Sequence, residues 1–421
     1  MKTNIFRLAI ILLTLQFVGG CTPDGYTYQD VSVVDLSQVD RVELLPNQLM
    51  VLADGHAQLD LRPMIYTKEG NLISDDRVKE EWLEYSADGG VAINRYFSTT
   101  DASLIGKTLT TRVKIKGTGV ESEPVSFRVA APLDQKYTSE ITIPVVVHII
   151  QTVEDIESYR GKYERDRLEL LLQKLNNVFG GTVSVNPVGV NTHIRFRFAQ
   201  YDLYGREMSE PGINRFSIDK IKTDNRYADF LKGQNLVWPA ERYMNIWLIS
   251  DRKGEVQNFG AAVSDYCQPH YVVSGVPTDN IPQGLALTEF PAETEFTPAE
   301  SGIVYKLQEL DELDRSFGPQ VPNELIYYVG RYLGLLSTCS YSGTGTDYCD
   351  DTMDYWRTDQ YANDNWYKNM NGCYFRAENI MDDPKGVHCA VSKNQCERIR
   401  WVLQNCPDRA AWKSDFAFTG K

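Results

Sequence analysis

The segment from residue 321 to residue 337 constrains the fold and function of this chain more than any other stretch. Its apolar spacing predicts one helix that runs into a turn at Gly334, because glycine readily adopts the left-handed conformation that ends helices. Tyr327 and Arg331 stand at positions i and i+4, so they share one face of this helix. The side chains on that face decide what chemistry the helix supports.

The elements before this helix are strands and one further helix. The continuous apolar run 141–150 predicts a strand that is buried on both faces. An amphipathic helix follows at 168–178, and alternating patterns predict strands at 193–198 and 244–249. We therefore expect an α+β domain over residues 138–421.

Residues 38–132 have an all-β pattern. Short apolar alternations such as Val125-Ser-Phe127-Arg-Val129 recur between turn sequences such as Gly117-Thr-Gly119. Several short strands over about a hundred residues are typical of an immunoglobulin-like β-sandwich. We expect this fold for 38–132, with residues 21–37 as a polar tether in front of it.

The N-terminus has the features of a secreted lipoprotein. Lys2 and Arg7 precede a short apolar run, which ends in Gly-Gly-Cys21. The apolar run is too short to span a bilayer, so residues 1–20 are predicted to be a lipoprotein signal peptide. We expect lipidation at Cys21, which would anchor the protein in the outer membrane of the cell envelope, on its periplasmic or its surface side.

The charge balance argues against one class of partner. The chain has 43 Lys and Arg against 57 Asp and Glu, a formal net charge of -14, and no run of basic residues. Proteins that bind nucleic acid carry clustered positive charge. We therefore expect no nucleic-acid partner.

Several short motifs along residues 138–407 match one known family in their order and spacing. They are Ile143–His148, Leu175-Asn176 with Phe179, Gly212–Arg215, Asn245–Trp247, Cys349–Thr352, Glu378–Asp382, His388-Cys389, and Gln395 with Arg398–Arg400. Together they resemble the pappalysin-type metzincin metallopeptidases, including their envelope lipoprotein relatives. The resemblance implies a zincin-like α+β domain with a mixed sheet, and a Met-turn that places Met381 beneath the site of the metal.

The same resemblance extends to the predicted helix. The family carries the zinc-binding pattern His-Glu-x-x-His-x-x-Gly-x-x-His. Here Tyr327, Arg331 and Ser337 stand at the three histidine positions, and Tyr328 stands at the glutamate position. Gly334, which turns the chain, matches the family. The chain therefore resembles a member that lacks the zinc ligands and the general base.

The chemistry of Arg331 supports the loss of zinc. A guanidinium keeps its proton in proteins and has no lone pair to offer a metal. We therefore expect no zinc cofactor and no catalytic residue. We also predict that Arg331 replaces the positive charge of the metal and pairs with a carboxylate, either Glu324 or one of Asp350 and Asp351.

Other residues offer only weak metal sites. None of the 5 histidines has a second histidine at i+3 or i+4, and His388 beside Cys389 lacks the converging ligands that a zinc site needs. Carboxylates after the helix could ligate calcium, although a solvated acidic loop is the alternative interpretation. These carboxylates are Asp350, Asp351, Asp354, Asp382 and Asp383.

Cysteines other than Cys21 lie only in the second half of the chain. In an oxidising compartment we expect them to form disulfides, with one thiol left over. They are Cys267, Cys339, Cys349, Cys373, Cys389, Cys396 and Cys406.

An aromatic stretch near the C-terminal third offers candidate binding residues. Tyr355, Trp356, Trp366 and Tyr367 lie among Asn and Asp residues. Exposed aromatic side chains with polar neighbours are typical binding anchors, whereas a loop packed by its own side chains is the alternative.

Our leading hypothesis is a lipid-anchored protein with a metzincin fold that binds a peptide or protein without hydrolysing it. An extended chain can pair with a strand edge without any chemistry. The first alternative is an active zinc metallopeptidase with ligands outside the helix motif. The second is an adhesion or glycan-binding module. The sequence leaves the ligand and the oligomeric state open.

Overall fold

The computed structural model describes most of the chain after the N-terminal segment. The described residues are 34–74, 77–152, 165–218, 231, 233–249, 281–285, 302–306, 324–340, 346–356, 367–370, 373–384 and 386–421. The predicted signal peptide, Cys21 and most of the predicted tether lie outside them, as do Cys267 and Trp366. No helix in the described part of the chain is long and apolar enough to cross a membrane.

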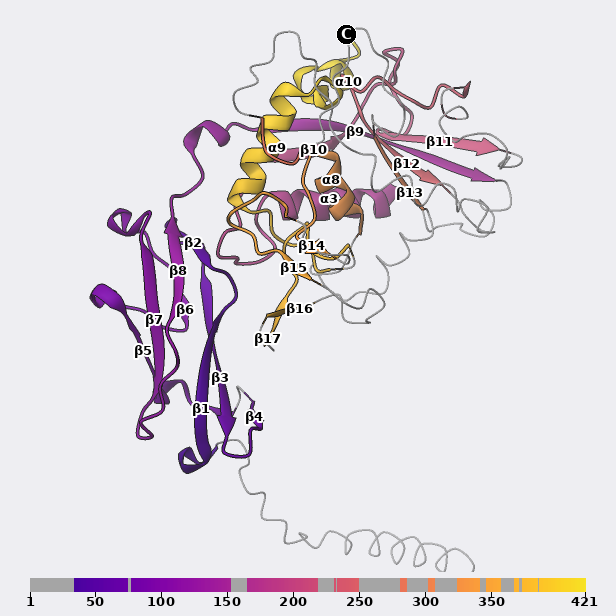
Figure 1. Cartoon of the computed structure of the whole chain (residues 1–421). Helices are drawn as coiled ribbons and strands as arrows, with labels where there is room; N and C mark the ends of the chain where they lie inside the picture. Colours follow the sequence, from indigo (N-terminus) through magenta and orange to yellow (C-terminus); the bar gives the residue numbers. More distant parts are fainter. Residues whose placement is uncertain are drawn as a thin grey trace, which may run out of the picture. The chain divides into compact units, whose positions relative to one another are not determined.

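Two four-stranded sheets occupy the region predicted to be all-β (Figure 1). In one sheet the order is β1-β3-β4, with β6 also paired to β3, and in the other it is β2-β8-β7-β5. The immunoglobulin-like arrangement of these sheets stays a prediction. The strands are β1 (Val39–Pro46), β2 (Met50–Leu52), β3 (Leu59–Thr67), β4 (Leu72–Ile73), β5 (Leu83–Ala87), β6 (Tyr96–Phe97), β7 (Thr108–Ile115) and β8 (Val125–Ala130).

The chain divides into two compact units, and the division passes through these sheets. The first unit comprises Met1–Leu44, Pro63–Tyr85 and Arg112–Glu123, and the second comprises Leu45–Arg62, Ser86–Thr111 and Pro124–Lys421. The second unit contains every residue of the candidate site that the structure describes.

A five-stranded sheet organises the second unit. β9 (Ile141–Thr152) lies in its centre, and the order is β10-β9-β12-β13, with β11 also paired to β9. All pairings among these described strands are parallel, so the predicted mixed sheet is not found in this part of the chain. The other strands are β10 (Ile194–Phe198), β11 (Ile213–Ile218), β12 (Met244–Ile249) and β13 (Gly302–Lys306).

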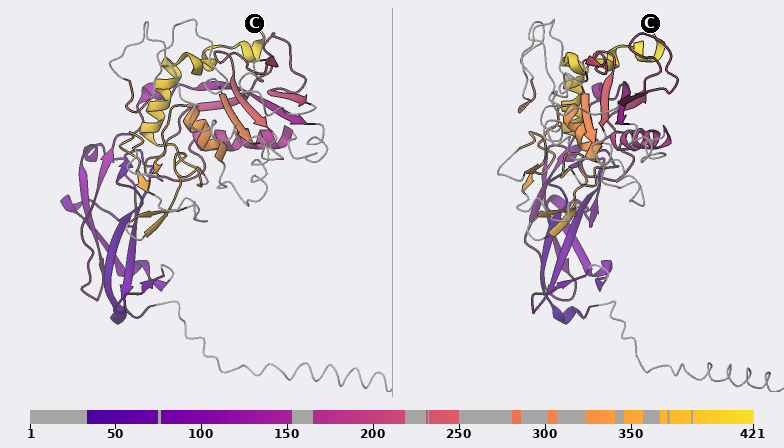
Figure 2. Two further views of the ribbon diagram at one scale, coloured as in Figure 1. Left: turned by 45° about the vertical axis from the view of Figure 1, so that its right-hand side comes forward. Right: turned by 90° about the vertical axis from the view of Figure 1, so that its right-hand side faces the viewer.

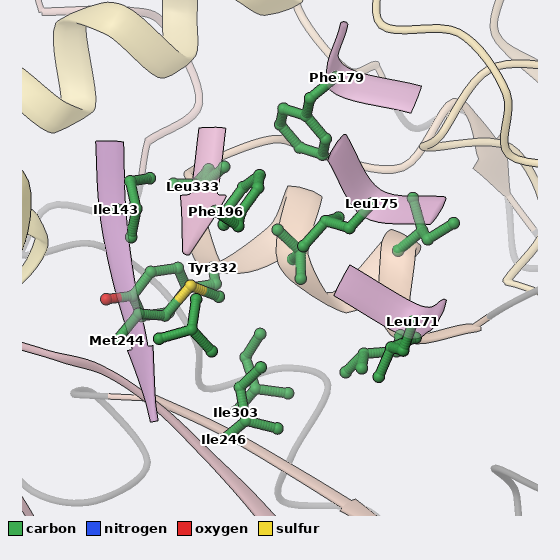
Figure 3. Packing of buried hydrophobic residues seen from close by; sticks show 14 of the residues in the cluster. Ile143, Leu171, Leu175, Phe179, Phe196, Met244, Ile246, Ile303, Tyr332 and Leu333 are labelled. Carbon is green, nitrogen blue, oxygen red and sulfur yellow. The ribbon is translucent and has the colours of Figure 1, made fainter. Parts of the chain in front are cut away.

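Two helices cover one face of this sheet. They are α3 (Arg165–Phe179) and α8 (Glu324–Tyr332), and Figure 2 shows them from two further directions. Alternate residues of β9, among them Ile143 and Val147, belong to one buried hydrophobic cluster together with residues of both helices. Figure 3 shows part of this cluster. Burial of each large apolar side chain stabilises the fold by about 1.5–3 kcal/mol. β9 is apolar along its length because both of its faces are buried, one against the helices and the other in a second core.

The opposite face of β9 carries a buried histidine. His148 is fully buried and stacks on Trp247, with ring centroids 5.8 Å apart. Its Nε2 lies 3.0 Å from Asn245 Oδ1, and its Nδ1 lies 3.0 Å from Asn214 Nδ2. Burial lowers the pKa of His148 to about 4, so the imidazole is neutral at physiological pH.

The C-terminal part adds short strands and one capped helix. α9 (Lys393–Asn405) begins with a capping box, in which Ser392 Oγ accepts from Gln395 N. The remaining helices and strands are β14 (Cys339–Ser340), β15 (Tyr355–Trp356), β16 (Tyr367–Met370), β17 (Cys373–Arg376), α10 (Phe416–Thr419), and the 3-10 helices η1 (Leu36–Gln38), η3 (Glu80–Trp82), η4 (Asp88–Gly90), η5 (Ala102–Leu104), η6 (Gln135–Tyr137), η9 (Pro407–Arg409) and η10 (Ala411–Lys413).

The prediction of disulfides is wrong for the cysteines whose side chains are described. All of these cysteines are buried thiols: Cys339, Cys349, Cys389, Cys396 and Cys406. Burial raises the pKa of Cys389, Cys396 and Cys406 to about 12, so these sulfurs behave as small apolar groups.

Candidate functional site

The helix that the sequence singles out runs into the predicted turn at Gly334. α8 stops at Tyr332, and Gly334 follows with a φ of 88°, a conformation that favours glycine. Two arginines from the C-terminal part close this end of the helix. Arg409 Nε donates to the carbonyl of Tyr332, and Arg398 Nε donates to the carbonyl of Gly334, both at 2.6 Å. Positive charge at a helix C-terminus is favourable because the last carbonyls are unpaired and the helix dipole is negative there.

Arg331 takes part in the same closure. Its Nη1 donates to the carbonyl oxygen of Leu335 at 3.3 Å. The predicted partner carboxylates do not pair with it within the described residues, and Asp351 uses both of its oxygens elsewhere, on Ser392 Oγ and Asn394 N. The predicted ion pair of Arg331 is therefore not found among the described residues, where the guanidinium donates to a carbonyl one turn ahead.

Met381 lies directly against α8. Met381 is fully buried, and a β-carbon added to Gly330 would lie 2.5 Å from its sulfur. Gly330 is therefore the residue that lets the two segments approach. The sequence analysis singled out Gly334 and Met381 but missed Gly330, whose position one residue before Arg331 was its only signal.

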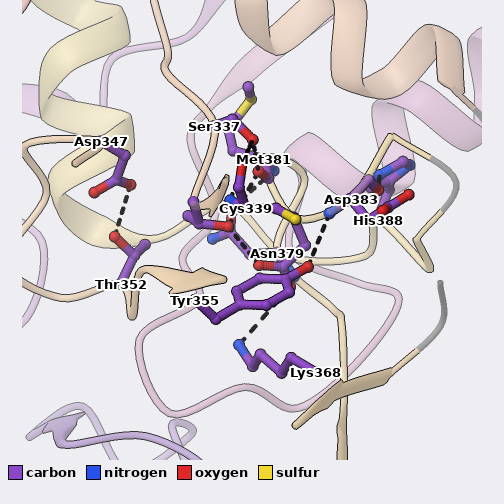
Figure 4. A network of polar contacts seen from close by, with 12 residues as sticks. Ser337, Cys339, Asp347, Thr352, Tyr355, Lys368, Asn379, Met381, Asp383 and His388 are labelled. Carbon is purple, nitrogen blue, oxygen red and sulfur yellow. Dashed lines mark hydrogen bonds and ion pairs between the residues drawn. The ribbon is translucent and has the colours of Figure 1, made fainter. Parts of the chain in front are cut away.

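The chain after the helix is fixed to the segment around Met381. Ser337 Oγ donates to the carbonyl of Cys339 at 2.9 Å and to that of Met381 at 3.3 Å. Thr338 Oγ1 donates to Asp382 Oδ1 at 2.6 Å. Figure 4 shows the network of polar contacts around Ser337 and Met381. The hydroxyl of Ser337 is therefore hydrogen-bonded to backbone carbonyls.

Buried polar groups continue this network on its other side. Asp382 Oδ2 accepts from Asn379 N at 3.0 Å, and Lys368 Nζ lies 3.8 Å from the same oxygen. Asn379 and Gln395 exchange two side-chain hydrogen bonds of 2.9 and 2.8 Å. The network therefore joins the segment around Met381 to the start of α9. Sequence analysis missed the roles of Asn379 and Lys368, although Asn379 lies inside the motif that carried the resemblance.

The two tyrosines at the start of the motif lie in an aromatic group. Tyr327 is buried, with 8% exposure, and its ring centroid lies 5.6 Å from that of Tyr328 and 6.2 Å from that of His388. The ring of Tyr328 in turn lies 5.8 Å from Tyr305 of β13. The structure thus brings together Tyr327, Tyr328 and His388, which the sequence analysis had considered separately.

The predicted aromatic binding residues have different environments. Tyr355 is buried, and its hydroxyl accepts a hydrogen bond of 3.0 Å from Asp383 N, so its ring is not offered to a ligand. Trp356 is 64% exposed and Tyr367 is 40% exposed. Trp356 is the register partner of Ser340 in the parallel pair of β14 and β15, and Ser340 follows α8 closely in the chain. Trp356 therefore lies on the strand beside the segment that leaves α8.

Metal-ligating side chains do not gather at this place. Within the ranges that the structure describes, no group of three or more His, Cys, Asp or Glu side chains could hold a metal ion. The acidic candidates are occupied otherwise: Asp351 holds the start of α9, and burial raises its pKa to about 6. Asp347 accepts from Thr352 Oγ1 at 2.7 Å. The arrangement offers hydroxyls, a guanidinium and backbone carbonyls.

Solved structures similar to this chain include two of one peptidase from Tannerella forsythia. No family model and no curated protein matches this chain. Mature mirolysin from Tannerella forsythia, in complex with a cleaved peptide, is 22% identical, and the match covers 66% of this chain and 97% of that chain with a TM-score of 0.41. A promirolysin variant from the same organism is 19% identical, and the match covers 68% of this chain and 87% of that chain with a TM-score of 0.40. At these scores the likeness carries no conclusion about activity.

Proposed function

We propose that this protein is a lipid-anchored envelope protein whose α+β domain has a metzincin-like fold without a zinc site. In this proposal Cys21 carries the lipid, the outer membrane is the location, and the remaining function is to bind a peptide or protein without hydrolysing it.

One observation carries the proposal. Arg331 stands one helical turn after Tyr327, where a second metal ligand would stand, and its guanidinium donates to the carbonyl of Leu335 at 3.3 Å. A permanently charged donor at that point repels a cation and has no lone pair for it. The side chain at this position stabilises the end of a helix.

The neighbouring residues support the same proposal. Ser337 donates its hydroxyl to the carbonyls of Cys339 and Met381, and Tyr328 brings a phenol to the position of the general base. Activation of water in a metallopeptidase needs a metal that lowers the pKa of the water, together with a base that takes the proton. None of these side chains supplies either function at neutral pH.

The packing of Met381 supports a metzincin-like scaffold. In our proposal the contact of Met381 with Gly330, together with the hydrogen bonds from Thr338 to Met381 and Asp382, corresponds to a Met-turn. A scaffold of this kind can be kept after its chemistry is lost, because fold does not determine function.

Exposed aromatic residues in the chain after α8 suggest how a ligand is held. Trp356 lies opposite Ser340 in register, and most of its side chain faces solvent. Exposed Trp and Tyr side chains supply much of the binding energy at protein interfaces. We therefore propose that an extended peptide contacts Trp356 and Tyr367.

The test combines binding with cleavage in one sample. Fluorescein-labelled unstructured peptides, including casein fragments, are titrated with purified protein, and the same mixtures are analysed later by mass spectrometry. The proposal expects a rise in anisotropy with intact peptides, and weaker binding by Trp356→Ala than by the control Tyr204→Ala, whose residue is also exposed, at 62%. Cleavage products that a chelator abolishes would support the zinc peptidase alternative and overturn the proposal.

A further inference from the structure

A polar groove lies beside α9 in the second unit. Its volume is about 770 Å³, and its walls come from η6, the 281–285 segment, the loop around Tyr348 and Asp350, and one side of α9. None of the functional residues discussed above for peptide binding lines it. A groove of this size accommodates a small ligand or part of a larger one.

An aromatic ring is held in place at the edge of this groove. Tyr348 has a φ of 55°, which is uncommon for a residue with a side chain, and its backbone N–H donates to Thr346 Oγ1 at 3.1 Å. The ring fills the space beside Gly284 where a side chain would otherwise stand, while Tyr348 remains 47% exposed. The fold thus keeps a rare backbone conformation and presents a fixed, accessible ring, an arrangement that is common at ligand sites.

The groove is lined by as many positively charged as negatively charged side chains. Lys136 and Arg398 contribute positive charge, and Asp350 and Glu397 contribute negative charge. A ligand with a net charge would meet attraction and repulsion together, so the lining favours a neutral ligand. The groove also contains the side chains of Gln283, Asn394 and Asn405, and amides both donate and accept.

Arg398 leaves a donor unused in this wall. Arg398 is only 4% exposed, and its Nε and Nη1 donate to the carbonyls of Gly334 and Gln283, both at 2.6 Å. Its Nη2 has no hydrogen-bond partner within the described residues. Nη2 is itself buried, so this nitrogen is not open to a ligand, and Arg398 serves to fix the wall through the carbonyls of Gly334 and Gln283.

The elements around the groove argue against a peptide as its ligand. Its lining residues lie on helices and loops, and none belongs to a strand that the structure describes. Backbone pairing with an extended peptide is therefore not available at these walls. Recognition has to come from side chains that offer rings, amides and carboxylates together.

We propose that this groove binds a neutral carbohydrate. Each sugar hydroxyl both donates and accepts, which matches the mixed lining, and the apolar face of a sugar ring packs on aromatic rings. Tyr348 and Trp401 supply the stacking surfaces. Asp350 and Glu397 accept hydrogen bonds from hydroxyl groups, and the amides donate to them.

The experiment uses the purified full chain on an array of neutral, sialylated and uronic-acid oligosaccharides. The neutral oligosaccharide with the strongest signal is then titrated by calorimetry into the wild type and into Tyr348→Asn, Asp350→Asn and Tyr204→Asn. Asparagine tolerates positive φ, so Tyr348→Asn removes the ring with little backbone strain. Tyr204 is exposed and lies outside the groove, so Tyr204→Asn serves as the matched control.

We expect binding of neutral oligosaccharides that Tyr348→Asn and Asp350→Asn each weaken by about tenfold or more, and that Tyr204→Asn leaves unchanged. An array without neutral ligands, or with acidic ligands only, would overturn the inference. So would equal affinity of Tyr348→Asn and the wild type. These outcomes do not depend on peptide binding at Trp356, so the two proposals fail separately.

Discussion

The sulfur of Met381 occupies the space that a side chain on Gly330 would need, since a β-carbon there would lie 2.5 Å from Sδ. Met381 is fully buried, so its thioether has little room to move. This contact joins the central helix α8 to the segment 379–382, which in turn is hydrogen-bonded to the start of α9. The glycine in the last turn of α8 is therefore explained by packing, although glycine lowers helix propensity.

Gly330→Ala is expected to destabilise the protein by about 1–3 kcal/mol, because overpacking a full core outweighs the gain in helix propensity. Urea denaturation measures the change. Gly233→Ala is the matched control, because a β-carbon at residue 233 meets nothing within 4 Å. The double variant Gly330→Ala/Met381→Ala should lose less stability than the sum of the two single variants. A Gly330→Ala variant as stable as the wild type would contradict the contact.

Arg331→Ala is expected to lower the free energy of unfolding by about 1 kcal/mol, because it removes a hydrogen bond to Leu335 and a positive charge at the end of α8. Arg331→Lys should retain part of this stability, since it keeps the charge and loses the planar donor. Denaturant midpoints of the three proteins provide the comparison. Equal midpoints would show that the helix end does not need this side chain.

Asp351→Asn is expected to destabilise the protein by about 1–3 kcal/mol at neutral pH. Asp351 accepts from Ser392 Oγ and from Asn394 N, both at 2.7 Å, and an amide can accept at only one of these two points. The exposed neighbour Asp350 gives the control, Asp350→Asn. Thermal unfolding at pH 7.5 distinguishes them, and equal melting temperatures of the two variants would be inconsistent with the network.

His148 should make the stability of the protein depend on pH. Its pKa is lowered by burial from 6.5 to about 4, so between these pH values the histidine is protonated in the unfolded chain and neutral in the folded chain. The stability contributed by this histidine is present above pH 6.5 and is lost as the pH falls from 6.5 towards 4. The full loss is about 3 kcal/mol.

The comparison of His148→Gln with the wild type isolates this contribution, because carboxylates such as Asp351 titrate with the opposite effect in the same range. The difference in unfolding free energy between the two proteins should change between pH 7 and pH 4.5. A constant difference would mean that His148 is not held neutral.

Hydrophobic periodicity in the sequence predicted several strands and one helix of the second unit. The strand β9, the helix α3 and the strands β10 and β12 were all predicted from the sequence, because hydrophobic periodicity acts over a few residues. The parallel pairing of the sheet was not, because register between distant strands is a property of the tertiary structure.

The candidate site shows the same division. The spacing of Tyr327, Arg331 and Ser337 was visible in the sequence, whereas the actual partner of Arg331 depends on where α8 ends. That end is fixed by Arg398 and Arg409, which are far away in the chain. The burial of Tyr355 and the thiol state of the cysteines likewise follow from packing, which composition does not reveal.

The zinc content of the purified protein tests the central claim most directly. The protein is equilibrated with excess zinc, unbound metal is removed, and the bound zinc is measured by elemental mass spectrometry. We expect far less than one zinc ion per chain. A zinc peptidase treated in the same way is the positive control. One zinc ion per chain, released when Tyr327→Phe is introduced, would show that this helix binds the metal and would contradict the account.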